Sequence, residues 1–420
     1  MSGKARPGRL ATRWLVEIWR EVMFRFQKTL WVVGSACLLL ACSGDGQAEG
    51  PPCPNCDQVA AIAQDAMATY DLRALILRVT VDDQPVFTEA LGESLPGVPA
   101  TADMKVRNGF VAYSYLTTIL LELVDDPRMN VHLSDPLSKY LPDLPRADQI
   151  TLLMLANSTS GYADYVYRPK VEEALKTDPD RQWSTDELIQ IGTSATPMFA
   201  PGTNWAYAHT NYAILGEVLE KAAGKPLSDL MAQYIFKPMG LRHTQGSDTP
   251  DIPPPVLHTF STERNGTYED STLWNPSWTA PAGALQTSDA ADLATSIAAI
   301  GSGRLLSSAS RDAQVLPHLI GFGHKVGDGS CPACRQNTEA FSFGLAVILQ
   351  GPWITGNKFF AGSGAAVGYL PQGKVAIAVI TTYRPDAFDP NGNVKQDAGQ
   401  AILSSVAAAM APDHPLPAPR

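Results

Sequence analysis

Residues 106–125 read V-R-N-G-F-V-A-Y-S-Y-L-T-T-I-L-L-E-L-V-D, and this stretch carries most of the information about the fold. Over residues 111–124 the side chains are apolar on nearly every face of a helix. A helix of this kind is typical of the centre of a domain, where neighbours bury it on all sides. The pattern therefore predicts a buried central helix that begins just after Gly109.

Short motifs after this helix follow one another in the order seen in a known family. They are L-S-D-P-L-S-K-Y-L-P at 133–142, N-S-T-S-G-Y at 157–162, F-A-P-G at 199–202, W-A-Y-A-H-T-N-Y-A-I-L-G at 205–216, F-K-P-M-G-L at 236–241 and A-G-A-L-Q-T at 282–287. The chain resembles the β-lactamase-related serine hydrolases, a family of class C β-lactamases, DD-peptidases and esterases. The resemblance runs from about residue 67 to residue 412.

The resemblance implies an α/β (α+β) fold in which helices from both ends of the domain flank an antiparallel sheet, beside a second, helix-rich lobe. We assign the domain to residues 57–412, followed by a tail at 413–420. The sheet lobe comprises 57–105 and 336–412, and the helical lobe comprises 106–310. Local patterns predict terminal helices at 57–70 and 394–410, and strands at 74–81, 86–91, 341–349, 359–364 and 375–382.

In this family a G-S-x-x-K segment opens the central helix. The serine attacks a carbonyl group, and the lysine one turn later handles its proton. Counting back from residues 123–125 without a gap, Gly109 matches the glycine, Phe110 falls on the serine and Tyr113 falls on the lysine. No other Ser-x-x-Lys occurs in the chain. A phenyl ring cannot attack a carbonyl, so the alignment predicts that the family's acyl-enzyme cannot form.

Two further family motifs are partly retained. The Tyr-x-Asn motif, which supplies a phenol for proton transfer and an amide for the substrate, corresponds to Tyr207 and His209, with imidazole in place of the amide. The Lys/His-Thr/Ser-Gly motif at the edge of the pocket corresponds to Gly362, Ser363 and Gly364, without the basic residue. Tyr207 is thus the one catalytic motif residue that remains.

Replacing a buried nucleophile and a lysine by aromatic rings removes desolvation costs, and each ring buries a large apolar area. The exchange at Phe110 and Tyr113 therefore predicts a smaller and more stable pocket.

Three hypotheses follow from the substitutions in the motifs. The protein can be a non-catalytic binder of cell-wall peptides or other acyl ligands, or an active serine hydrolase with a relocated nucleophile, for which Ser363 near Tyr207 is the candidate. It can also be a structural or assembly partner whose pocket has no role. A cleft lined by polar groups favours the first two hypotheses, and a filled cleft favours the third.

Composition excludes several classes of protein. An apolar fraction of 45% and a charged fraction of 18% exclude a disordered chain. The chain has 32 basic and 42 acidic side chains, and residues 1–41 hold seven of the basic and two of the acidic ones. The remaining chain therefore has 25 basic and 40 acidic side chains, a net charge of −15. This acidic balance disfavours nucleic-acid binding. The chain has no His-Glu-x-x-His and no phosphate-binding loop, so we expect neither a metal nor a cofactor.

The N-terminus resembles a bacterial lipoprotein signal. Basic residues Arg25 and Lys28 precede an apolar run at 30–40, which is too short to span a bilayer and ends in L-L-A-C. We expect residues 1–41 to be removed and Cys42 to be lipidated. An ordinary secretory peptide with a chance cysteine is the alternative.

Such a cleavage would leave the mature protein attached to a membrane through its lipid, facing the periplasm, at the outer membrane in a Gram-negative host. Residues 42–56 would form a flexible tether. The leader is unusually long when counted from residue 1, which favours Met23 as the true start.

Four other cysteines form two C-x-x-C pairs, Cys53 with Cys56 and Cys331 with Cys334. A double C-x-x-C can supply a four-thiolate zinc site. Outside the cytoplasm, two local disulfides are favoured over zinc.

Overall fold

The computed structural model describes residues 53, 55–109, 111–264 and 266–417, without the side chains of residues 358 and 359. The predicted signal peptide, Cys42 and Phe110 lie outside the described residues.

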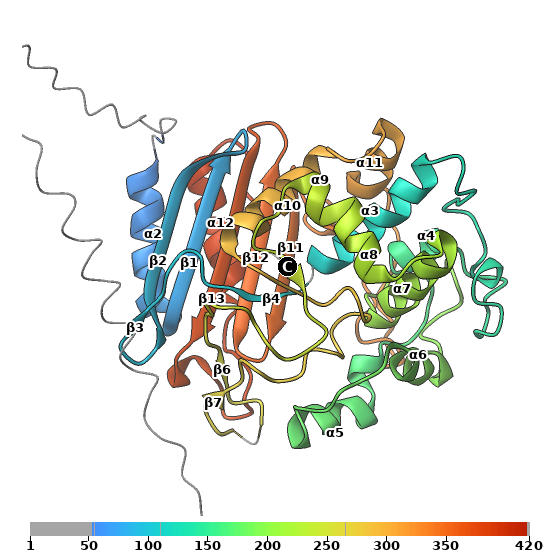
Figure 1. Ribbon diagram of the computed structural model, residues 1–420, viewed down its shortest axis with the longest axis horizontal. Coiled ribbons are helices and arrows are strands. Elements are labelled where there is room, and N and C mark those ends of the chain that lie inside the picture. Colours follow the sequence, from blue (N-terminus) through green and yellow to red (C-terminus); the bar gives the residue numbers. More distant parts are fainter. Residues whose placement is uncertain (1–52, 54, 110, 265, 418–420) are drawn as a thin grey trace, which may run out of the picture. The chain divides into compact units, whose positions relative to one another are not determined.

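An eight-stranded antiparallel sheet forms the core of the domain, in the order β3-β2-β1-β13-β12-β11-β10-β9 (Figure 1). Its strands are β1 (Leu72–Val81), β2 (Gln84–Leu95), β3 (Val98–Pro99), β9 (Ser342–Phe343), β10 (Ile348–Gln350), β11 (Trp353–Phe360), β12 (Ser363–Leu370) and β13 (Val375–Tyr383). Early and late parts of the chain meet where β1 pairs with β13. This arrangement confirms the predicted antiparallel sheet built from both ends of the domain.

The predicted strand at 359–364 is wrong, because the chain reverses within it. Ala361 and Gly362 have φ values of 46° and 78°, and they join β11 to β12 as a tight hairpin turn. Positive φ at both central residues is what a two-residue hairpin needs, and glycine adopts it readily. The predicted strand at 341–349 is also wrong as one element, since a turn divides it into β9 and β10.

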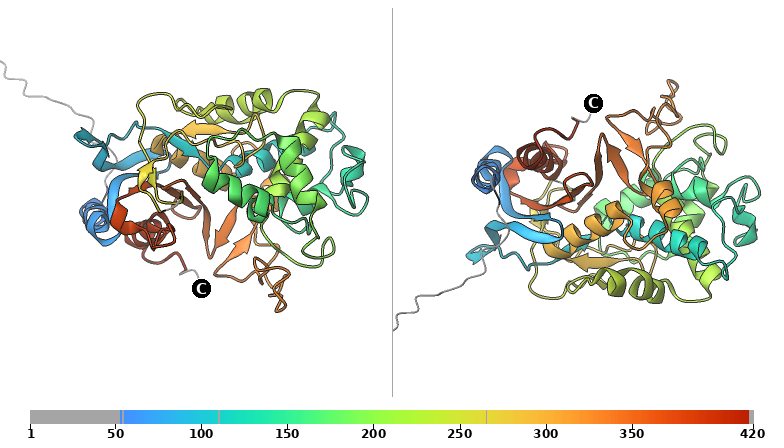
Figure 2. Two further views of the ribbon diagram at one scale, coloured as in Figure 1. Left: turned by 90° about the horizontal axis from the view of Figure 1, so that it is seen from below. Right: turned by 90° about the horizontal axis from the view of Figure 1, so that it is seen from above.

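Helices cover both faces of the sheet. On one face lie α2 (Cys56–Thr69) and α12 (Ala398–Met410), which pack against each other and against β1 and β13 (Figure 2). On the other face α10 (Ala290–Ser302) packs against β12, β13 and β1, although its sequence falls within the predicted helical lobe. Strand β13 is buried at every residue, and its side chains point alternately into two apolar cores, one on each face of the sheet.

The central helix α3 (Val111–Asp125) is buried along most of its length, as its apolar pattern predicts. It contacts α7 (His209–Ala223), α8 (Leu227–Met231), α10 and α11 (Ser308–Val315). Among the described residues, no helix combines the length and the apolar character needed to cross a membrane.

The remaining elements are short. They are η1 (Leu137–Lys139), α4 (Leu152–Ala156), η2 (Tyr165–Tyr167), α5 (Pro169–Thr177), α6 (Thr185–Ser194), η3 (Ala232–Phe236), α9 (Lys237–Met239), η4 (Pro385–Ala387), and the strands β4 (Val106–Asn108), β5 (Gln245–Gly246), β6 (Phe260–Ser261), β7 (Glu269–Asp270) and β8 (Gln286–Ser288). Strand β4 pairs with β8 and leads directly toward the start of α3.

Candidate functional site

A cavity of about 530 Å³ lies at the start of α3, beside the start of α7. Aromatic side chains make up much of its wall, and several amides and two arginines add polar groups. The lining residues are Arg107, Asn108, Gly109, Tyr113, Tyr167, Trp205, Tyr207, His209, Pro276, Trp278, Thr279, Ala280, Leu285, Gln286, Arg335, Phe341, Phe343, Ile348, Gln350, Asn357, Phe360, Asp397 and Gln400. The described side chains therefore leave an open cleft, and its smaller size relative to a catalytic family member stays a prediction.

Tyr113, at the position of the family's lysine, lies in the first turn of α3 and is only 5% exposed. Its ring stacks on Tyr212 with centroids 4.4 Å apart, and its hydroxyl donates to the backbone carbonyl oxygen of Thr279. Burial raises the pKa of this phenol well above its usual value. Tyr113 is thus a neutral donor bound to the backbone.

His209 is the first residue of α7 and Tyr207 lies two residues before it, and both line the cavity. Their ring centroids are 5.0 Å apart, and the ring of Tyr113 lies 6.4 Å from Tyr207 and 6.0 Å from His209. Burial raises the pKa of Tyr207 well above its usual value. The structure therefore brings together three of the positions that the motifs single out.

His209 is held by a carboxylate that sequence reasoning missed. Its Nδ1 lies 2.9 Å from Oδ2 of Asp164, while Oδ1 of Asp164 accepts a hydrogen bond from the backbone N–H of Val166 at 3.0 Å. Asp164 is 4% exposed. It follows the N-S-T-S-G-Y segment by two residues, and only that proximity could have drawn attention to it.

The third motif does not reach the cavity, since none of Gly362, Ser363 and Gly364 is among its lining residues. A Cβ atom at position 362 would come within 1.7 Å of the carbonyl oxygen of Phe260. Ser363 is 2% exposed, and its Oγ has no hydrogen-bond partner among the described residues. This placement gives no support to Ser363 as a relocated nucleophile.

Two further polar residues in the cavity come from β4 and were not singled out by the sequence. Arg107 donates to Oγ of Ser247 at 3.1 Å and to the carbonyl oxygen of Thr249 at 2.9 Å, and burial lowers its pKa to about 10. Asn108 donates from Nδ2 to Oε1 of Gln286 at 3.1 Å. No family motif that we recognise in the sequence covers these residues.

Both C-x-x-C pairs form local disulfides, Cys53–Cys56 and Cys331–Cys334, which is the pairing favoured over zinc. Cys331 and Cys334 are 1% and 3% exposed. The loop that they close leads directly to Arg335 at the cavity.

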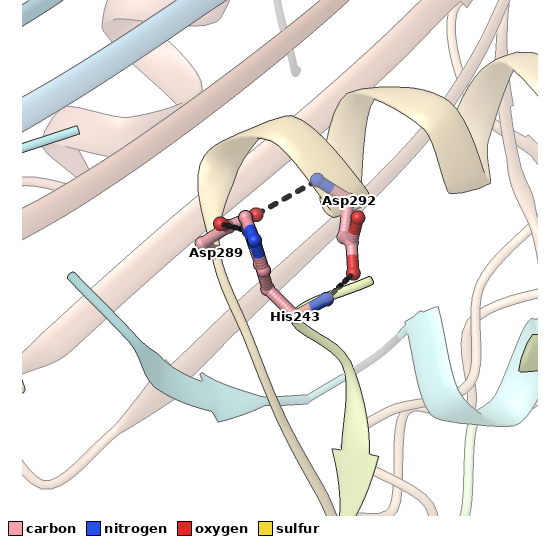
Figure 3. Close-up of side chains that lie close together, drawn as sticks. All are labelled: His243, Asp289 and Asp292. Atoms are coloured by element: carbon pink, nitrogen blue, oxygen red, sulfur yellow. Dashed lines mark hydrogen bonds and ion pairs between the residues drawn. The ribbon is translucent and has the colours of Figure 1, made fainter. Parts of the chain in front are cut away.

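A group of His243, Asp289 and Asp292 lies outside the cavity lining (Figure 3). Asp292 accepts hydrogen bonds from the backbone N–H groups of His243 and Thr244, both at 2.7 Å. Asp289 caps the N-terminus of α10 and contacts Nδ1 of His243. These contacts hold the segment before β5 against α10, so the three residues have a structural role.

Comparison with known proteins places this fold and site in a family. A family model described as Beta-lactamase matches residues 59–401. The D-alanyl-D-alanine-carboxypeptidase/endopeptidase AmpH of Escherichia coli K12 is 29% identical over 180 residues, covering 41% of this chain and 45% of that protein. A D-aminopeptidase of Cereibacter sphaeroides is 31% identical over 141 residues, covering 33% of this chain and 26% of that protein. The matched segments thus span less than half the length of these relatives.

Solved structures share the fold across most of the chain. A D-stereospecific amidohydrolase from Streptomyces aligns with a TM-score of 0.67 at 22% identity, covering 84% of this chain and 98% of that one. The D-amino acid amidase of Ochrobactrum anthropi SV3, complexed with D-phenylalanine, aligns with a TM-score of 0.68 at 19% identity, covering 84% and 99%. Since the family model spans most of the described domain and the order of motifs agrees with it, the chain belongs to the Beta-lactamase family.

Proposed function

We propose that this protein binds a ligand in the family's cleft without carrying out the family's acyl transfer. The observation that carries the proposal is Tyr113, whose neutral phenol is stacked and bonded to the backbone where the mechanism needs a lysine. The sequence adds Phe110 at the nucleophile position. The open cavity beside Tyr113 favours a binding role over a purely structural one.

The ligand that fits this cavity is an acyl or peptide compound with an apolar body. The wall offers rings from Trp278, Tyr207 and Phe343, and amides from Asn108 and Gln286 can meet a peptide group. The relatives named for D-alanyl peptides and D-amino acids work on compounds of this class.

The first test is acylation by a penicillin, followed by intact mass of the mature protein. No penicilloyl adduct is expected, because position 110 offers no nucleophile. A stoichiometric adduct would contradict the proposal.

The second test is binding of N-acetyl-D-phenylalaninamide, a neutral probe, by calorimetry. We expect reversible binding without turnover. Replacing Trp278, which lines the cavity, by alanine is expected to weaken binding, whereas Tyr140→Ala changes a partly buried ring outside the lining and leaves it unchanged. Hydrolysis of the amide at an enzymatic rate would overturn the non-catalytic role.

We also propose that the mature chain begins at a lipidated Cys42 and is anchored to the envelope membrane. The L-L-A-C segment and the apolar run before it support this proposal. Labelled palmitate is expected to enter the wild-type protein and not Cys42→Ala. Equal labelling of the two would refute the anchor.

A further inference from the structure

Arg335 is a cation at the cavity that forms no ion pair among the described residues. It lines the cavity, with its guanidinium carbon 4.3 Å from the ring centroid of Phe341 and 5.3 Å from that of Trp205. Among the described residues it has no carboxylate partner, and no side-chain hydrogen bond holds its guanidinium. Contact with the rings partly desolvates the guanidinium and lowers its pKa, although the residue as a whole is exposed.

The other arginine of the cavity differs in this respect. Arg107 is 6% exposed, and its two terminal nitrogens donate to Ser247 and to the carbonyl oxygens of Thr249 and Asp251. These bonds hold the segment at 247–251 against β4, which gives Arg107 a structural role. Arg335 has no comparable role in the fold.

The backbone around Arg335 is fixed before any ligand arrives. The buried disulfide Cys331–Cys334 immediately precedes it, and the N–H of Asn337 donates to the carbonyl oxygen of Phe322 at 2.9 Å. A group held in place in this way loses little conformational entropy on binding.

A row of rings leads from Arg335 into the cavity. Centroid distances are 5.8 Å from Phe341 to Trp205, 5.3 Å from Trp205 to Phe343, 6.3 Å from Phe343 to Tyr207 and 5.0 Å from Tyr207 to His209. Trp205 and Phe343 are only 1% and 2% exposed, so the row offers a ligand the partly buried rings of Phe341 and Tyr207. A ligand body against these two rings can place its charged end at the guanidinium.

We infer that Arg335 binds a carboxylate of the ligand, so that the cavity selects a carboxylic acid with an apolar body over the neutral amide of the same compound. A guanidinium that lies flat on rings still directs its N–H groups outward in the plane, where a carboxylate can accept two hydrogen bonds. In a chain with a formal net charge of −10, a cation without a partner is a local site for an anion. This inference rests on the proposed function, since it names the ligand class of the same cleft.

The test compares N-acetyl-D-phenylalanine with N-acetyl-D-phenylalaninamide by calorimetry, which differ in one charge and little in shape. The wild-type protein is expected to bind the acid about tenfold more tightly than the amide, as one charge-assisted pair at a partly exposed position allows. Raising the salt concentration is expected to weaken binding of the acid and to leave the amide unaffected.

Arg335→Gln is expected to bind the acid and the amide equally and to melt at the wild-type temperature. The matched control is Arg181→Gln, because Arg181 also lies over a ring, 3.9 Å from the centroid of Trp183, but does not line the cavity. This control is expected to keep the tenfold preference.

Equal affinities of the wild type for acid and amide, or an unchanged preference in Arg335→Gln, would overturn the role of Arg335 and leave the proposed function standing. Failure of both compounds to bind would overturn both proposals. A penicilloyl adduct would overturn the proposed non-catalytic function and would leave the role of Arg335 in binding a carboxylate untouched.

Discussion

The two sides of the cavity differ in how far their polar groups are already bonded within the protein. On the side of α3, Tyr113 donates to the backbone and stacks on Tyr212, and His209 is bonded to a buried aspartate. Elsewhere in the lining, the guanidinium of Arg335 lies over the rings of Phe341 and Trp205 and has no carboxylate partner among the described residues. The side chains at the motif positions are therefore held by internal contacts, whereas Arg335 forms no ion pair in the described part of the chain. Under the proposed function, the first group shapes the cavity and Arg335 supplies a charge for recognition.

The largest effect is expected when the first motif is introduced by the double substitution Phe110→Ser and Tyr113→Lys, which tests whether the α3 side of the cavity can support catalysis. We expect the double variant to remain inactive, because His209 is engaged with Asp164 and position 362 offers no cation. Losing a nucleophile and its base costs roughly a millionfold in turnover, and two residues without their supporting groups do not recover it. The measurement is ester turnover; rates within a hundredfold of an active family member would show that the α3 side is intact.

High pH tests the stability of the α3 side of the cavity, because buried tyrosine phenols must ionise there. Burial raises the pKa of five tyrosines at the central helix and its neighbours, namely Tyr113, Tyr115, Tyr165, Tyr207 and Tyr212. Because the pKa is higher in the folded than in the unfolded state, this stabilisation is fully present below about pH 10 and is lost as the pH rises above it. Each phenol is expected to contribute a loss of about 1.4 kcal/mol per pH unit above that point.

Phenolate absorbance and near-ultraviolet circular dichroism measure this effect together. Absorbance from these five groups is expected to rise only as the dichroism is lost. Ionisation of all tyrosines near pH 10 with the dichroism intact would show that these phenols are open to solvent.

The single variant Tyr113→Lys measures the packing of the same side. We expect a loss of roughly 3 to 5 kcal/mol in the free energy of unfolding, the usual cost of deleting a buried aromatic ring. The control is Tyr167→Lys, since Tyr167 lines the same cavity but is 61% exposed. Denaturant unfolding of both variants decides the matter, and similar small losses would place the ring of Tyr113 outside the core.

The smallest expected loss of stability follows substitution of Asp164, the aspartate bonded to His209. Asp270 provides a control, because it makes the same two contacts in an exposed position. Asp164 accepts from the N–H two residues later and contacts His209, and Asp270 does the same with Thr272 and His258. Their side chains are 5% and 41% exposed. Asp164→Asn is expected to cost about 1.5 to 3 kcal/mol, and Asp270→Asn less than about 1 kcal/mol because solvent screens that pair. Equal losses on thermal melting would show that burial does not decide the strength of these pairs.

The sequence predicts the fold well where a pattern is long or ordered. The apolar run of α3 and the order of the motifs place the central helix and the antiparallel sheet, and both are present. The pattern fails over 359–364, because an apolar run with a reversal inside it reads as one strand when only side-chain character is considered. Ala361 has a positive φ, and the presence of an alanine in the sequence does not predict this backbone conformation.

The candidate site divides in the same way. Tyr113, Tyr207 and His209 are found from motif positions alone, and the structure gathers them at one cavity. Asp164 and Arg335 are not found in this way. Asp164 contacts His209, 45 positions away, and Arg335 contacts Trp205 as well as the nearby Phe341, and no local motif encodes the distant contacts. The open volume of the cavity likewise results from how whole elements pack, which no single motif encodes.

The hairpin turn that contains Gly362 restricts which residues can occupy this position. With φ at 78° and the carbonyl oxygen of Phe260 in the space of a Cβ atom, the position accepts no side chain at all. Lysine or histidine at this position requires at least two nucleotide changes in a glycine codon, and either side chain would disrupt the hairpin. A side chain at position 362 therefore requires a rearranged contact between the turn and β6, so we expect substitutions there to be tolerated only together with changes in β6.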